Sequence, residues 1–272
     1  MKKYIFFDID GTLIDFRGKI PESTINALNA VREAGHKIFL CTGRSVCQMQ
    51  KELNRVTFDG MVAASGAYVE CDGKEVYHHY MPKEDVMAVI DEFHKEGTMF
   101  CCQTKEHSLR EEDSRIKFLD LFKRRGMSEK NLESIFNGED KDITIEDNID
   151  KIEKIIYNES THTVDELKSI FCKNIDVVRM SYDSMDIYSG EISTYGINKA
   201  LGIEKVLEYY GGSIEDTMAF GDGPNDFEMI EYVNTGIVMG NGIDELKKKA
   251  DYVTKDILDH GIESALKHFG LI

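Results

Sequence analysis

The chain has 272 residues and carries 33 Lys and Arg against 50 Asp and Glu, so its formal net charge is −17. This charge argues against non-specific binding of nucleic acid and against attraction to an anionic membrane surface, because both partners are themselves negative. The length predicts roughly two domains, and no apolar run reaches the ~18 residues that a transmembrane helix requires.

The cysteines indicate a reducing environment. The chain has six, and they form neither a Cys-x-x-Cys pair nor zinc-ligand spacing with a nearby His. Several lie inside apolar runs, where a free thiol behaves as a small hydrophobic group. The apolar stretch after Lys2 and Lys3 is too short for the hydrophobic region of a signal peptide. We therefore expect reduced thiols and a cytoplasmic location.

The first part of the chain, residues 1–82, alternates two kinds of pattern. Runs that are apolar at successive positions cover residues 4–7, 37–40 and 60–64. Such runs are typical of strands that are buried on both faces of a parallel sheet. Apolar residues at helical spacing lie between them, over residues 22–34 and 45–53, and predict two helices.

The middle of the chain, residues 83–188, has the pattern of a separate unit. We expect helices over residues 83–96, 108–125 and 163–171, and strands over residues 98–104, 151–157, 175–180 and 185–188. Strand and helix then alternate again, with a helix over residues 199–210 and strands over residues 217–220 and 236–239.

These patterns predict an α/β fold with two domains. The core is expected to be a Rossmann-like, doubly wound parallel sheet formed by residues 1–82 plus 189–272. Residues 83–188 are expected to form an α/β domain that is inserted into this core.

Polar and glycine-rich segments follow the expected core strands. They are Asp8 and Asp10, Thr42-Gly43-Arg44, Ser65-Gly66, Gly221-Asp222-Gly223-Pro224-Asn225-Asp226, and Gly240-Asn241-Gly242. Ligands of an open parallel sheet bind outside the carboxyl ends of its strands, so these residues are expected to meet at one edge. The glycines there allow backbone amides to approach a bound anion closely.

Two other phosphate or metal motifs do not fit these segments. A calcium loop needs Gly at its sixth position and Glu at its twelfth, whereas the segment that starts at Asp8 has Gly11 fourth and Lys19 twelfth. The segment from Gly221 to Asp226 lacks the Gly-Lys-Ser/Thr ending of a Walker loop.

Four of the motifs together resemble a known family. Asp8-Ile9-Asp10-Gly11-Thr12, Thr42-Gly43-Arg44, Lys199 and Gly221-Asp222-Gly223-Pro224-Asn225-Asp226 resemble, in this order, the motifs of the haloacid dehalogenase superfamily of phosphatases. By position and size, the inserted domain resembles the α/β (C2B-type) cap of the Cof-type branch. The chain departs from that branch at Ser65, where Asn is frequent, and at Ala200, where Gly is frequent.

The resemblance implies roles for the catalytic residues. Asp8 would attack the phosphorus of a phosphomonoester and form an aspartyl-phosphate, which divides one difficult displacement into two easier ones. Asp10 would protonate the leaving alcohol and then deprotonate the hydrolytic water, which requires a pKa raised toward neutrality. Thr42 and Lys199 would complete the catalytic group by stabilising the transferring oxygens.

The resemblance also implies a metal and a phosphate site. The metal would be held by the Asp8 carboxylate, the Asp10 carbonyl, Asp222 and Asp226. The phosphate would be bound by Gly11, Thr42, Gly43, Lys199 and Asn225. Four carboxylates bring a charge of about −4 while Lys199 offers only +1, so a hard divalent cation is expected, and Mg²⁺ is the usual choice beside phosphate.

The expected activity is Mg²⁺-dependent hydrolysis of a small phosphorylated metabolite, such as a sugar phosphate, by a monomer or homodimer. The inserted domain is expected to set specificity, because the core contacts only the phosphate. A phosphomutase or phosphotransferase of the same superfamily shares both aspartates and remains an alternative. A regulator that binds metal or phosphate without catalysis is a third, although such a protein usually lacks one catalytic Asp.

Overall fold

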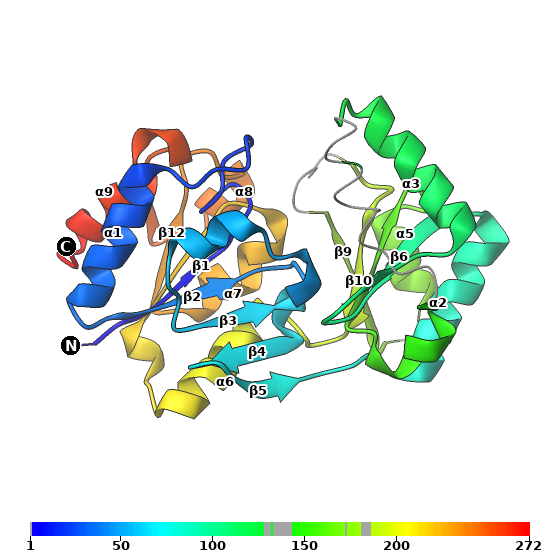
Figure 1. Cartoon of the computed structure of the whole chain (residues 1–272), viewed down its shortest axis with the longest axis horizontal. Coiled ribbons are helices and arrows are strands. Elements are labelled where there is room, and N and C mark those ends of the chain that lie inside the picture. Colours follow the sequence, from blue (N-terminus) through cyan, green and yellow to red (C-terminus); the bar gives the residue numbers. More distant parts are fainter. Residues whose placement is uncertain (1, 128–131, 133–142, 172, 181–185) are drawn as a thin grey trace. The chain divides into compact units, whose positions relative to one another are not determined.

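The computed structural model of the protein describes residues 2–127, 132, 143–171, 173–180 and 186–272 (Figure 1). The chain divides into two compact units, which are described separately. The first contains residues 1–45, 49–78 and 197–272, and the second contains residues 46–48 and 79–196. Each unit has its own sheet and its own hydrophobic cores.

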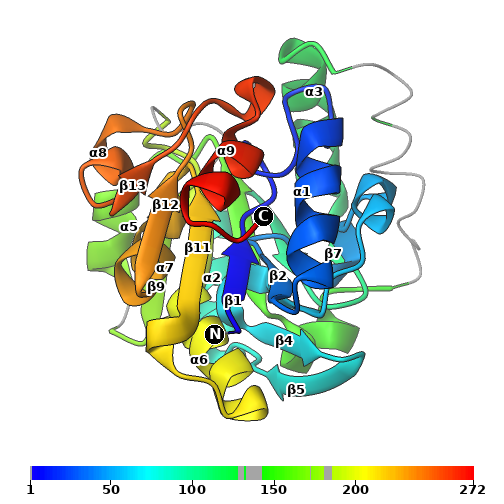
Figure 2. The ribbon, with the colours of Figure 1, turned by 90° about the vertical axis from the view of Figure 1, so that its left-hand side faces the viewer.

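The main sheet of the first unit has the strand order β13-β12-β11-β1-β2-β3-β4-β5. Its strands are β1 (Tyr4–Phe7), β2 (Lys37–Cys41), β3 (Gly60–Ala63), β4 (Tyr68–Cys71), β5 (Lys74–His78), β11 (Thr217–Gly221), β12 (Thr235–Val238) and β13 (Tyr252–Val253). Neighbours are parallel from β13 to β3, and β1 lies between β11 and β2 (Figure 2). β4 pairs in antiparallel fashion with β3 on one side and with the edge strand β5 on the other. The predicted α/β fold with a mainly parallel sheet is confirmed.

Both faces of the main sheet are buried, which explains the uninterrupted apolar runs of its strands. The helices of this unit are α1 (Glu22–Glu33), α6 (Lys199–Tyr210), α7 (Phe227–Tyr232), α8 (Asp244–Lys247) and α9 (Gly261–His268). Ile5 and Phe7 of β1 pack in one core with residues of α1 and α9. Tyr4 and Phe6 point to the other face and pack with residues of α6 and α7. The sheet is therefore covered by helices on both sides, and its functional groups must lie at the strand ends.

Two segments that follow β2 along the chain differ from the sequence predictions. The single helix expected over residues 45–53 is replaced by two short 3₁₀ segments, η1 (Val46–Gln48) and η2 (Lys51–Arg55), because Gln50 has extended backbone between them. The hairpin β4–β5 was not predicted. Its Asp72-Gly73 turn, with positive φ at both residues, is a strong hairpin signal in the sequence.

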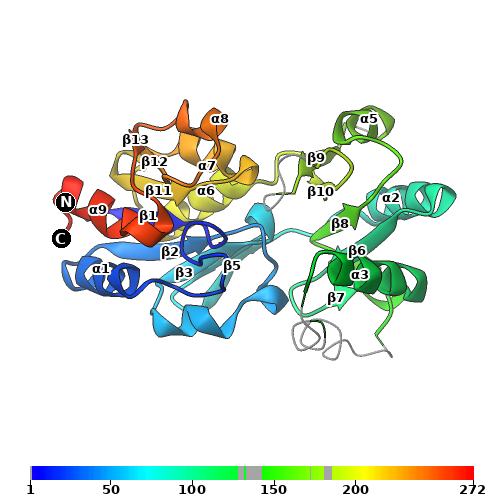
Figure 3. The ribbon, with the colours of Figure 1, turned by 90° about the horizontal axis from the view of Figure 1, so that it is seen from above.

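The second unit contains an antiparallel sheet in the order β7-β6-β8-β10-β9 (Figure 3). Its strands are β6 (Met99–Gln103), β7 (Ser108–Leu109), β8 (Lys154–Asn158), β9 (Ile175–Arg179) and β10 (Gly190–Thr194), and its helices are α2 (Lys83–Glu96), α3 (Glu112–Arg124) and α5 (Val164–Ile170). One face of this sheet packs with α2 and α5. The other packs with α3 through Met99 and Cys101. An α/β cap sheet is thus inserted into the main fold.

The second unit also differs from the predictions in detail. It continues past the expected boundary at residue 188, because β10 pairs with β8 and β9. Residues 108–109 form a strand, so α3 begins at Glu112. The strand expected over residues 185–188 begins outside the described residues, and residues 186–188 are irregular. None of the described helices combines the length and apolar character needed to cross a membrane.

Candidate active site

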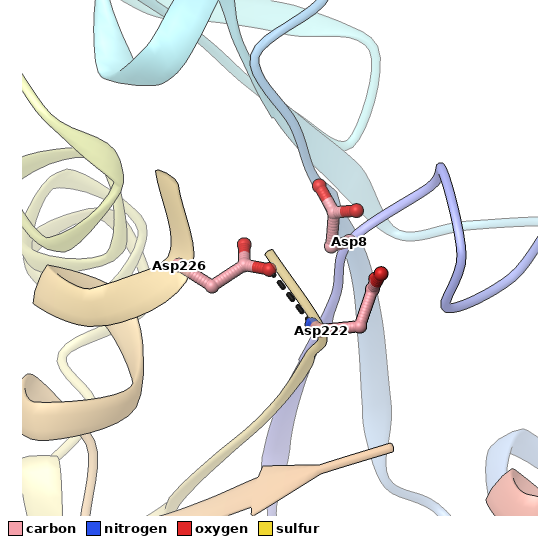
Figure 4. A group of neighbouring side chains, drawn as sticks. All are labelled: Asp8, Asp222 and Asp226. Atoms are coloured by element: carbon pink, nitrogen blue, oxygen red, sulfur yellow. Dashed lines mark hydrogen bonds between the residues drawn. The ribbon is translucent and has the colours of Figure 1, made fainter. Parts of the chain in front are cut away.

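The carboxyl ends of two neighbouring strands bring two aspartates together. Asp8 directly follows β1, and its amide continues the ladder by donating to the carbonyl of Phe220 at 2.9 Å. Asp222 directly follows β11, the neighbour of β1. With Asp226 they form a group in which one carboxylate oxygen from each residue lies within 4.8 Å of the other two (Figure 4). The three carboxylates therefore form one acidic cluster at this edge of the sheet.

Asp226 holds the loop that follows β11. It belongs to the 3₁₀ segment η6 (Pro224–Asp226), and its side chain is completely buried. Its Oδ2 accepts hydrogen bonds from the amides of Asp222 and Gly223, each at 2.9 Å (Figure 4 draws the first). These two bonds fix the Asp226 carboxylate and the backbone of the loop against each other.

Lys199 is the cation of the acidic cluster. It is the first residue of α6, and the side chain of Asn198 caps this helix by accepting from the amide of Leu201 at 3.0 Å. The Nζ of Lys199 is buried and donates to Asp8 Oδ1 at 2.6 Å and to Asp226 Oδ1 at 2.5 Å. The first residue of α6 thus places one positive charge between the carboxylates of Asp8 and Asp226.

One lysine does not neutralise three carboxylates, and burial is the main cause of the raised pKa values of Asp222 and Asp8. Burial raises the pKa of Asp222 to about 7, and the nearby charge of Asp226 adds to this effect. Burial also raises the pKa of Asp8, against the opposing effect of Lys199. Burial by itself would lower the pKa of Lys199, but Asp226 and Asp8 outweigh it and raise the pKa, so the ammonium group stays charged.

The loop after β1 forms one wall of the cluster. Gly11 has a φ of +85°, and a Cβ at this position would lie 2.2 Å from Asp222 Oδ2, so a side chain has no room. Thr12 donates from Oγ1 to Asp222 Oδ1 at 2.7 Å, and Asn241 donates from Nδ2 to the carbonyl of Gly11 at 2.7 Å. These contacts fix the loop against the carboxylates.

The carboxylate of Asp10 lies outside this cluster and has its own cation. Arg44 donates from Nε and from Nη2 to the two oxygens of Asp10, each at 2.7 Å. The Asp10 side chain is 42% exposed, in contrast to 7% for Asp8. The two aspartates of the first motif therefore have different environments. The predicted metal contact of Asp10 concerned its carbonyl oxygen and stays a prediction.

The ends of β2 and β11 contribute further groups. Thr42 is buried, its amide donates to the carbonyl of Val62 at 2.8 Å, and its Oγ1 accepts from the amide of Arg44 at 3.1 Å. The neighbouring Gly43 is buried as well. Asn225 has a buried Oδ1 that finds no hydrogen-bond partner within the described part of the chain. An orphaned polar atom of this kind is expected where a ligand supplies the missing partner.

The end of β3 supports Lys199 indirectly. Ser65 donates its amide to the carbonyl of Thr42 at 3.0 Å. A Cβ on Gly66, whose φ is +101°, would lie 2.0 Å from the carbonyl oxygen of Asn198. The close approach of these two backbones sets where α6, and with it Lys199, begins.

Three residues of the site received no role from the sequence. Thr12 stands in the first motif, and Asn198 is a preferred capping residue directly before a helix, so both carried a readable signal. Arg44 stands in the second motif, but its partner could not be read from spacing, since Asp10 is 34 residues away.

The family profile of haloacid dehalogenase-like hydrolases matches residues 5–266 of the chain. The chain belongs to this family. The resemblance of its four motifs to the superfamily is thereby confirmed.

Individual relatives of this haloacid dehalogenase-like hydrolase match over almost their whole length. YkrA of Bacillus subtilis, a candidate phosphatase by its name, is 30% identical over 275 residues, which cover 99% of this chain and 98% of YkrA. The 5-amino-6-(5-phospho-D-ribitylamino)uracil phosphatase YitU of the same organism is 27% identical over 281 residues, covering 97% and 96%.

A solved structure extends the likeness to the whole fold. The subclass IIB sugar phosphatase BT4131 has a TM-score of 0.78 at 28% identity, and the match covers 100% of both chains. The family match and these likenesses identify the chain as a phosphatase of the superfamily that acts on small phosphorylated metabolites, with a Cof-type cap.

The residues present fit a divalent metal ion. Asp8, Asp222 and Asp226 offer carboxylate oxygens, the donors that hard divalent cations prefer. Burial mainly, and then the charge of Asp226, raise the pKa of Asp222, and a cation beside the carboxylate would oppose both effects. The donor chemistry and the electrostatics of the cluster thus agree with a metal site.

Proposed function

We propose that this haloacid dehalogenase-like hydrolase is a Mg²⁺-dependent phosphatase that hydrolyses small phosphomonoesters through an aspartyl-phosphate on Asp8. The observation that carries the proposal is the cluster at the sheet edge, where buried Lys199 donates to Asp8 and Asp226 and Asp222 lies in the same group. A carboxylate in this position is a nucleophile that a neighbouring cation holds in place.

Asp8 would perform the first displacement. Lys199 bonds to its Oδ1, while Oδ2 accepts no hydrogen bond from the described residues, so Oδ2 is the oxygen suited to attack. A bond forms between this oxygen and phosphorus as the bond from phosphorus to the ester oxygen breaks. Asp10 would donate a proton to the departing alkoxide, which leaves as an alcohol.

The second displacement would reverse these roles. Water attacks the phosphorus of the aspartyl-phosphate and gives a proton to Asp10, and the bond between phosphorus and Asp8 breaks. The net reaction consumes one ester and one water and yields one alcohol and one phosphate. Asp8 and Asp10 return to their starting states, as a catalytic cycle requires.

Other residues would hold the phosphoryl oxygens. The amides near Gly11 and Gly43, the hydroxyl of Thr42 and the side chain of Asn225 are suited to donate hydrogen bonds to them. Lys199 would offset the negative charge that develops in the transition state. The unpartnered Oδ1 of Asn225 supports a ligand contact there, because the amide could turn either end toward a ligand.

Mg²⁺ would be held by Asp8, Asp222, Asp226 and the carbonyl of Asp10. When bound, it supplies positive charge that orients the phosphate and makes the phosphorus more electrophilic. The roles of Thr12 and of the amides of Asp222 and Gly223 would be to orient these carboxylates, as outer partners do at metal sites.

A sugar phosphate or a comparable metabolite is the proposed substrate. The likeness to the sugar phosphatase BT4131 supports this class. The name of YitU supports a phosphorylated ribityl compound as another member of the same class. Both are small phosphomonoesters of a polyhydroxylated carbon chain.

The proposal is tested by phosphate release from p-nitrophenyl phosphate and from a panel of sugar phosphates, with Mg²⁺ and with EDTA. Wild type is expected to turn over only with Mg²⁺, and Asp8→Asn is expected to lose at least about 10³-fold in kcat. Turnover that survives in Asp8→Asn would remove the proposed intermediate. Turnover that needs a catalytic bisphosphate would favour the mutase instead.

A further inference from the structure

The Asp10 carboxylate is held by a two-pronged contact. Arg44 Nε donates to Asp10 Oδ2 and Arg44 Nη2 donates to Oδ1, each at 2.7 Å. Two parallel bonds between a planar guanidinium and a planar carboxylate fix the rotation of the carboxylate as well as its position. Within the described part of the chain, Arg44 is the residue that donates hydrogen bonds to this carboxylate.

This contact is separate from the one that holds Asp8. Lys199 bonds to Asp8 and Asp226, whereas the Asp10 carboxylate bonds to Arg44. In the motif after β1, Asp8 therefore pairs with a lysine and Asp10 pairs with an arginine. A lysine is a point charge, whereas an arginine fork imposes an orientation. This difference agrees with the proposed roles: the charge of the nucleophile Asp8 must be balanced, whereas the acid and base Asp10 must point at the atom that exchanges the proton.

The backbone of Arg44 is itself well anchored. Its amide donates to Thr42 Oγ1 at 3.1 Å, and its carbonyl accepts from the amide of Ala64 at 2.8 Å. The hydrogen-bond network assigns the amide oxygen of Gln50 to the side facing Arg44, where it accepts from Nη1 and Nη2 at 3.2 Å each. Gln50 is thus a second hydrogen-bond partner of the guanidinium, beside Asp10.

We propose that Arg44 is the positioning residue of Asp10, and that the fork aims the Asp10 carboxylate at the leaving oxygen and the hydrolytic water. The proposal rests on the function proposed above. Arg44 then acts on the reaction only through Asp10. Substitution of Arg44 should therefore lower kcat/KM most for esters whose leaving group needs a proton from a correctly placed acid.

Two esters of nearly equal size separate this role from phosphate binding. p-Nitrophenoxide leaves readily without a proton, whereas the phenoxide of phenyl phosphate depends more on an acid. Arg44→Ala is expected to lower kcat/KM about 10- to 100-fold more for phenyl phosphate than for p-nitrophenyl phosphate. Arg44→Lys should recover little of this loss, and added guanidinium should recover part of it in Arg44→Ala.

A double-mutant cycle with Asp10→Asn tests the route of the effect. Because Arg44 acts through Asp10, Arg44→Ala in the Asp10→Asn background should cause no further loss. Arg124→Lys is the matched control, since Arg124 makes a two-pronged contact with Glu159 at 2.9 and 3.0 Å in the second unit. It should leave both esters unaffected, and thermal unfolding of each variant shows that the protein is folded.

The outcomes separate the two proposals. Equal losses for both esters, or additive losses in the cycle, would overturn the role of Arg44 while leaving the phosphatase intact. Wild-type protein that hydrolyses neither ester with Mg²⁺ would overturn the proposed function and the role of Arg44 together. An ester-dependent, non-additive loss supports both.

Discussion

Each unit of the molecule contains a buried lysine paired with a carboxylate, and the two pairs differ in their surroundings. In the second unit, Lys154 of β8 donates to Glu191 of β10 at 2.7 Å, and the side chains are 3% and 9% exposed. In the first unit, Lys199 donates to Asp8 and Asp226, with Asp222 in the same cluster.

The difference shows how a buried ion pair can be recognised as functional. The pair of Lys154 and Glu191 contains one positive and one negative charge, so burial is compensated within the pair. The cluster around Lys199 has three carboxylates for one lysine, and burial together with the charge of Asp226 raises the pKa of Asp222 to about 7. Such a cluster is costly for a fold by itself and becomes favourable when a cation and a phosphate are bound.

Exchanging each lysine for methionine should give the largest difference in activity between the two ion pairs. Lys199→Met is expected to lower kcat on p-nitrophenyl phosphate about 10²- to 10³-fold, because the developing charge loses its buried partner. Lys154→Met should keep kcat close to that of wild type, although it leaves Glu191 without this partner. Steady-state kinetics with saturating Mg²⁺ measures both, and an equal loss in the two variants would place Lys154 in the reaction.

Replacing both partners of a pair tests whether the two ion pairs also differ in their contribution to the free energy of unfolding. Lys154→Met with Glu191→Leu should leave the free energy of unfolding unchanged or raise it by about 1–4 kcal/mol. Lys199→Met with Asp226→Leu should lower this free energy by about 3–5 kcal/mol. Asp8 then stays buried without its cation, and the amides of Asp222 and Gly223 lose their acceptor. Urea unfolding followed by circular dichroism gives both values, and two equal changes would contradict the distinction.

The pH dependence of stability should differ with and without Mg²⁺. The pKa of Asp222 is about 7 in the folded protein, against an ordinary 3.8. A raised carboxyl pKa means that the folded state holds the proton more tightly, so its stabilising contribution is present below pH 3.8 and is lost as the pH rises toward 7.

Without metal, this group should therefore lower the free energy of unfolding by up to a few kcal/mol between these pH values. Mg²⁺ binds the ionised carboxylates, so it should raise Tm more at pH 8 than at pH 5. Thermal scans with Mg²⁺ and with EDTA test this, and Asp222→Asn should flatten the difference. A larger Mg²⁺ effect at pH 5 would contradict it.

The smallest effects are expected at two helix caps, one in each unit. Asn198 caps α6 by accepting from Leu201 at 3.0 Å, and Thr163 caps α5 by accepting from Glu166 at 3.2 Å. Replacing either residue by alanine should cost about 1 kcal/mol of stability. Only Asn198→Ala should also lower kcat, because the cap it removes precedes Lys199. Equal kinetics in the two variants would show that Lys199 is positioned without its cap.

The main sheet was predictable because its strands are buried on both faces. This produces apolar runs such as Tyr4–Phe7, which differ clearly from the helices between them. The edge hairpin β4–β5 was missed because β5 is largely exposed or half-buried, which removes the signal of an apolar run. The sequence predicts a helix across Gln50 because the spacing of apolar residues does not reveal the extended backbone at this residue.

The candidate site was predictable in composition and less so in its contacts. Asp8, Asp222 and Asp226 were expected together because each follows a strand of one sheet, and they lie within 4.8 Å. The Asp10 carboxylate was expected beside Asp8 in a shared charge cluster. The carboxylate instead bonds to Arg44. This contact depends on the path of the loop after β2, which no local sequence pattern encodes.

The chemical groups and the sheet edge at which they meet could be read from the sequence, because apolar runs locate the strands and each motif directly follows a strand or starts a helix. Only the tertiary structure decided which cation serves which carboxylate. Lys199 reaches Asp8 across 191 residues and Arg44 reaches Asp10 across 34. The physical reason is that charge interactions depend on distance and burial in the folded chain, and neither is a property of spacing along the sequence.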